Sequence, residues 1–72
     1  MTIDMESFSK LVRYVIEAHE GTPVLLGNVE FWLDDDRLIY SKPSETWDAD
    51  AIANSLTLRL RLLNADPQAL LT

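Results

Sequence analysis

An α+β fold is predicted by three patterns in this 72-residue sequence: a helical repeat of apolar residues, a central stretch of alternating strands, and a leucine-rich segment near the end. The expected order is helix, strand, strand, strand, helix, followed by a short C-terminal helical turn. The short connections favour a three-stranded antiparallel meander with two helices packed on one face. The length fits a single domain spanning residues 1–72.

The first helix is predicted by apolar residues at three- and four-residue spacing between positions 8 and 19. Thr2 or Asp4 can cap its start, because their side-chain oxygens can accept from free backbone N–H groups. Gly21 can adopt the left-handed conformation that ends a helix. Charged side chains on the opposite face are expected to form two ion pairs, Glu6 with Lys10 and Arg13 with Glu17.

Residues 24–40 are predicted to form three strands joined by two tight turns. In the central strand apolar and polar residues alternate, so Phe31 is expected in the core and Trp32 on the opposite face. A glycine–asparagine pair at 27–28 suits the first turn, since both residues tolerate positive φ. The aspartates at 34–36 repel one another unless the second turn exposes them to solvent.

The second helix is predicted to begin between residues 45 and 54, where Asp48 and neighbouring hydroxyl side chains can cap it. Residues 56–62 alternate strictly and would also suit a strand. We favour a helix because leucine, arginine and alanine are good helix formers and β-branched residues are nearly absent. The strand alternative stays open. A cap followed by proline at Asp66-Pro67 predicts a closing turn over residues 68–71.

As a helix, this segment has an apolar arc of about 220°, wider than the ~100° stripe that packing on a sheet requires. The closing turn could cover part of the excess. A second copy of the chain could cover the rest, which makes a homodimeric structural or regulatory subunit the alternative function. Arg59 lies inside the arc, where its stem can pack against the surface or its guanidinium can pair with a partner carboxylate. The predicted dimer interface consists of Leu58, Leu62 and Arg59.

The composition disfavours an enzyme or a metal protein. The chain has no cysteine, one histidine and two glycines, so it lacks a thiol nucleophile, a set of spaced metal ligands and a phosphate-binding loop. His19 is expected to be partly buried and hydrogen-bonded. The aspartates at 34–36 lack the spacing of a calcium loop, and Asp48 and Asp50 belong to a chain too small to enclose a glycosidase cleft. We expect no catalytic residue, metal or cofactor.

The charge favours a basic protein partner. Twelve acidic residues oppose six basic ones, giving a net charge of −6, which disfavours nucleic acid and anionic membranes. No apolar run approaches the ~20 residues of a membrane span, and the N-terminus is acidic where a signal peptide is basic, so a cytoplasmic protein is expected. Trp32 either packs on a neighbour such as Ile39 or anchors a partner. The predicted partner-binding residues are Asp34, Asp35, Asp36, Glu45, Asp48, Asp50 and Trp32.

The element order and length resemble those of double-stranded-RNA-binding domains, over most of the chain but in topology only. That family contacts phosphates with basic residues at the start of its second helix, whereas residues 45–50 here read Glu-Thr-Trp-Asp-Ala-Asp. Direct binding of nucleic acid is therefore not expected. In size, acidity and element order the chain also resembles small phage-encoded inhibitors, including certain anti-CRISPR proteins, and bacterial immunity proteins. This resemblance implies a non-enzymatic inhibitor or adaptor that presents carboxylates to a partner's nucleic-acid-binding surface.

Overall fold

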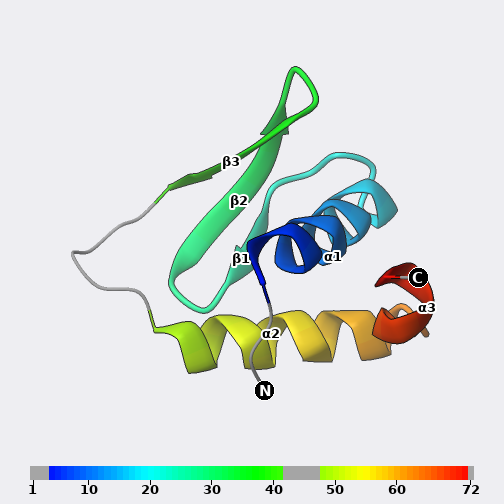
Figure 1. Cartoon of the computed structure of the whole chain (residues 1–72). Coiled ribbons are helices and arrows are strands. Elements are labelled where there is room, and N and C mark those ends of the chain that lie inside the picture. Colours follow the sequence, from blue (N-terminus) through cyan, green and yellow to red (C-terminus); the bar gives the residue numbers. More distant parts are fainter. Residues whose placement is uncertain (1–3, 42–47, 72) are drawn as a thin grey trace.

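The predicted α+β architecture is confirmed by the computed structural model, which describes residues 4–41 and 48–71 (Figure 1). The three strands form an antiparallel sheet in the order β1-β2-β3, with the helices on one face. Residues 56–62 are helical, so the strand alternative is wrong. The elements are α1 (Met5–Ala18), β1 (Val24–Leu26), β2 (Val29–Asp34), β3 (Arg37–Ser41), α2 (Ala49–Leu62) and α3 (Pro67–Leu71).

The hydrophobic core lies between the sheet and the two long helices. Phe31 on β2 is buried at its centre, as predicted, and meets Phe8 of α1 edge to face with 5.7 Å between the ring centroids. Each long helix and each of the first two strands contributes to this core, so none of them packs independently of the others. The buried residues are Leu11, Val12, Val15, Ile16, Val24, Leu26, Val29, Phe31, Ile52, Leu56 and Leu60.

Helix α1 begins at Asp4, one of the two caps that the sequence allowed. The carboxylate of Asp4 accepts a hydrogen bond from the backbone N–H of Ser7 at 2.7 Å. The backbone and side-chain hydrogen bonds from Ser7 lower the pKa of Asp4 below its usual value, because they favour the charged carboxylate.

The end of α1 uses two consecutive left-handed residues. Gly21 has the expected positive φ, 82°, and its N–H bonds the carbonyl of Ile16 at 2.9 Å; Glu20 before it also has positive φ, 59°. His19 is the C-terminal cap and is exposed. The expectation that His19 is partly buried is therefore wrong, because His19 lies at the end of the helix, beyond the buried stripe that ends at Ile16.

Helix α2 packs directly against the first hairpin turn. Gly27 has a φ of 61°, and a Cβ atom there would lie 3.1 Å from Cγ1 and from the backbone nitrogen of Ile52. The N–H of Gly27 donates to the hydroxyl of Ser55 at 3.1 Å. The turn therefore requires glycine both for its backbone conformation and for the close approach of α2.

Candidate interaction surfaces

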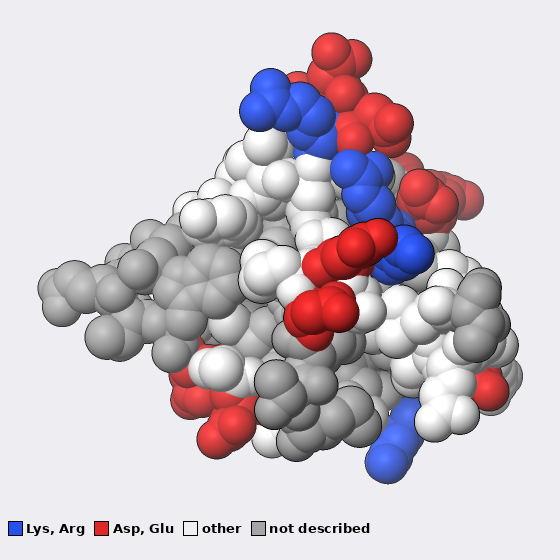
Figure 2. Space-filling model, in the orientation of Figure 1, with Lys and Arg blue, Asp and Glu red and all other residues white. Residues whose placement is uncertain are grey.

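The three consecutive aspartates lie where β2 turns into β3, at the top of Figures 1 and 2: Asp34 ends β2, and Asp35 and Asp36 form the turn. Asp35 and Asp36 have φ values of 53° and 67°, and a two-residue type I′ turn requires positive φ at both central residues. Aspartate is one of the few residues other than glycine that adopt this conformation readily. The chemistry of the turn accounts for part of the acidic run. All three side chains, including Asp34, are exposed and accessible to a partner.

Two arginine side chains lie close to these aspartates in the folded chain. Arg13 of α1 donates to the backbone oxygen of Asp36 at 2.7 Å and lies 3.4 Å from its carboxylate, in place of the predicted pairing with Glu17. Together the carbonyl and the carboxylate offer the guanidinium two acceptors. Arg37 is the register partner of Asp34, so the end of the hairpin combines both signs of charge (Figure 2). The other predicted pair, Lys10 with Glu6, is confirmed at 4.0 Å.

The second acidic group lies at the start of α2, far from the hairpin. Asp48 caps the helix by accepting from the N–H of Ala51 at 3.1 Å, and Asp50 is exposed in its first turn. Figure 1 shows the start of α2 and the β2–β3 turn at opposite ends of the molecule. Glu45 lies outside the described residues. The structure therefore does not bring the two predicted acidic groups together.

Trp32 lies on the face of the sheet opposite the helices, as predicted from the alternation along β2. Its register partner on β3 is Ile39, and both side chains are half-buried. Leu25 of β1 lies on the same face with 57% of its surface exposed. A cross-strand neighbour thus accounts for part of the burial of Trp32, and the open face retains a small apolar surface.

Helix α2 has a second apolar face that the rest of the described chain leaves open. Leu58 and Leu62 are 57% and 75% exposed, and their four-residue spacing places them next to each other along the helix. The closing turn α3 packs mainly against α1 and does not cover them. The buried stripe of α2 is narrower than the arc in the sequence and consists of Ile52, Leu56 and Leu60.

Arg59, predicted at the dimer interface, contacts its own chain. Its Nη2 atom lies 3.4 Å from the carbonyl oxygen of Leu25 on β1. The side chain is half-buried, which fits a stem packed along the surface. The guanidinium therefore supports the contact between α2 and the first strand.

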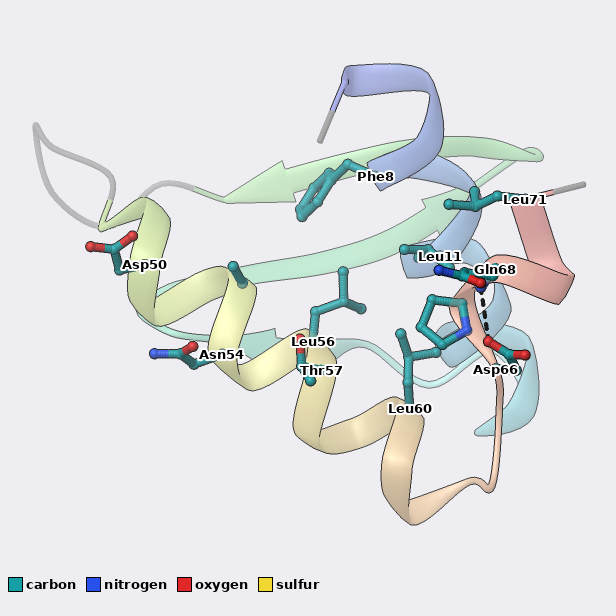
Figure 3. Close-up of a pocket in the computed structure, with 12 residues that line it drawn as sticks. Phe8, Leu11, Asp50, Asn54, Leu56, Thr57, Leu60, Asp66, Gln68 and Leu71 are labelled. Atoms are coloured by element: carbon teal, nitrogen blue, oxygen red, sulfur yellow. Dashed lines mark hydrogen bonds between the residues drawn. The ribbon is translucent and has the colours of Figure 1, made fainter. Parts of the chain in front are cut away.

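A groove of about 680 Å³, which the sequence analysis missed, lies between α1, α2 and α3 (Figure 3). Asp50 lies at one end of the groove and Asp66 at the other, where its carboxylate accepts from the N–H of Gln68 at 3.0 Å. The Asp66-Pro67 helix start was the one available signal, because it folds the end of the chain back toward α1. The apolar lining includes Phe8, Leu11, Leu56, Leu60 and Leu71.

Within residues 4–41 and 48–71, no three histidine, aspartate or glutamate side chains gather closely enough to hold a metal ion. In the same part of the chain, no helix combines the length and the apolar character needed to cross a membrane. No family model, curated protein or solved structure matches the chain.

Proposed function

We propose that this chain is a non-enzymatic protein–protein interaction protein, an inhibitor or adaptor whose carboxylates engage a basic surface of a partner. The observation that supports this most is that every acidic side chain in the described residues is exposed. Among those residues, only Glu6 and Asp36 lie within 4.0 Å of a described lysine or arginine. A surface on which most carboxylates have no such partner attracts basic proteins and accelerates their association.

The two separated acidic groups suggest two roles. The hairpin aspartates at 34–36 project from one end of the molecule and would steer the partner toward the chain. Asp50, two residues after the cap Asp48, lines the groove, where a partner could be held. The preferred partner is a protein whose own surface binds phosphates, because lysine and arginine concentrate there. Small phage-encoded inhibitors would act in this way, and the proposal places both proteins in the cytoplasm.

Affinity capture tests the proposal. The original chain and the variant Asp34→Asn, Asp35→Asn, Asp36→Asn serve as baits in lysate of the cell that encodes the chain. Asparagine tolerates the left-handed turn, so the variant should fold. We expect one basic protein to be recovered at low salt, released at high salt, and recovered less by the variant.

A matched bait removes the same number of charges elsewhere, through the exposed residues Glu17, Glu20 and Glu30 changed to glutamine. It should retain more of the partner than the hairpin variant. Equal recovery by all three baits, or no partner whose recovery depends on salt, contradicts the proposal.

A second candidate function is a homodimeric structural or regulatory subunit, favoured by the exposed Leu58 and Leu62 on one face of α2. A soluble helix with two adjacent, largely exposed leucines gains stability when a second apolar surface covers them. This face differs from the acidic hairpin, so a dimer could also bind the basic partner.

A further inference from the structure

We propose that the groove between α1, α2 and α3 holds an amphipathic helix of the partner, with basic residues at both of its ends. This inference rests on the proposed function, because it names the element of the basic partner that the chain binds. The groove has a volume of about 680 Å³. Leu11, Leu56 and Leu60 form its buried floor, and the half-buried Phe8 and Leu71 offer apolar contacts to the occupant.

The walls of the groove favour a helix over an extended peptide. All the described residues that line it belong to the three helices or to the segment just before α3, and none of them belongs to a strand. An extended occupant would therefore find no row of backbone groups to pair with, whereas a helix satisfies its own. From Asp50 to Leu60 the wall formed by α2 measures about 15 Å, the length of roughly ten helical residues. Apolar anchors at i, i+3 or i+4, and i+7 fit this length.

The charges at the two ends of the groove determine the charge of the occupant. Asp50 and Asp66 are exposed at opposite ends, and no lysine or arginine is among the described lining residues (Figure 3). Neither carboxylate forms a salt bridge with a described cation. Lysine or arginine at each end of the bound helix would therefore find a carboxylate, and an acidic helix would be repelled.

The probe is a synthetic peptide of about 14 residues, long enough to populate a helix. It has leucine at the anchor positions and lysine at both ends, and a companion has glutamate in place of lysine. Each is titrated into the isotope-labelled full chain and followed by NMR. The lysine peptide should shift the amide signals of Leu11, Thr57 and Leu71. It should bind about tenfold or more tightly than its companion at low salt.

Two pairs of variants separate the groove from general charge attraction. Ala53→Arg places a large cation in the groove, whereas Ala18→Arg adds the same charge on α1 outside it; both positions are exposed. The first variant should bind the lysine peptide about tenfold or more weakly than the original chain, and the second should change the affinity far less. The double variant Asp50→Asn, Asp66→Asn should lose more affinity for the lysine peptide than the double variant Asp34→Asn, Asp35→Asn, which removes the same charge at the hairpin.

Several results would overturn the inference. One is equal affinity of the lysine peptide for the Ala53→Arg and Ala18→Arg variants. Another is a set of amide shifts centred on Trp32 and Ile39, and a third is no amide shift at millimolar peptide. Groove shifts that follow protein concentration without peptide would mean that a second copy occupies the groove. If the lysine peptide does not bind, but affinity capture still recovers a basic partner that the hairpin variant recovers less well, only the groove inference is wrong. If capture fails while the peptide binds as described, the proposed function is wrong.

Discussion

At the scale of single residues, the two glycines have different structural roles. Gly27 and Gly21 both have positive φ, but only Gly27 has another element within 4 Å of the position its Cβ would occupy. Gly21→Ala should lower the free energy of unfolding by about 1–2 kcal/mol through backbone strain alone. Gly27→Ala should lower the free energy of unfolding by about 2–4 kcal/mol, because the methyl group of the alanine also displaces Ile52. Urea denaturation of both variants measures the difference, and equal losses would show that α2 does not pack against the turn.

A non-glycine residue in the left-handed conformation offers a stabilising substitution. Glu20 occupies the position after the C-terminal cap of α1 with a φ of 59°. Glu20→Gly should raise the free energy of unfolding by about 0.5–1 kcal/mol, or a few degrees in Tm. Asn64 ends α2 with a φ of 55°, and Asn64→Gly should gain less because asparagine tolerates this conformation. A loss of stability in Glu20→Gly, as glycine would cause inside the helix at Glu17, would contradict this account.

The cap of α1 predicts a pH effect. The pKa of Asp4 is lowered in the folded chain, so its charge stabilises the fold above the unfolded pKa, and this contribution is lost as pH falls through the folded pKa. Asp4→Asn retains a capping acceptor but does not titrate. The Tm of the original chain should exceed that of the variant at neutral pH, and the difference should shrink below about pH 4. A difference that stays constant from neutral to acidic pH would mean that the charge of Asp4 contributes nothing.

At the scale of elements, the sequence predicted the secondary structure because each element has a local signal. Asp4 and Asp48 cap their helices, and Gly27 turns the first hairpin. Within 56–62 the alternation was ambiguous, and the helix-forming residues correctly favoured a helix. Long-range features were not predictable, because the contact between Arg13 and Asp36 and the groove beside α3 depend on how distant elements pack.

The exposed leucines of α2 predict self-association. Leu58→Lys with Leu62→Lys should give a folded monomer, because neither side chain belongs to the buried core. Thr57→Lys, an exposed position on the groove side of the same helix, is the matched control and should leave the dimer intact. Light scattering across protein concentrations measures the assembly. A monomeric original chain at high micromolar concentration would exclude the dimer.

At the scale of the whole molecule, the sequence predicted the acidic character but not its arrangement. A net charge of −6 is a sum over residues, so composition suffices to obtain it. The separation of residues 34–36 from Asp48 and Asp50 depends on the tertiary fold. The position of Trp32 was predictable, since alternation along the strand places its side chain on the other face of the sheet from Phe31. Whether Trp32 contacts a partner stays a prediction.

The proposed function depends most on the exposed carboxylates of the hairpin, and the association rate constant with the captured partner tests them most directly. It should be measured at low and high salt for the original chain, the Asp34→Asn, Asp35→Asn, Asp36→Asn variant and the matched glutamine variant. Steering by these aspartates predicts that association slows as salt rises, and that at low salt the hairpin variant associates more slowly than the matched variant. An association rate that is the same for all three chains at both salt concentrations would contradict the proposal and leave the aspartates with a role in the turn alone.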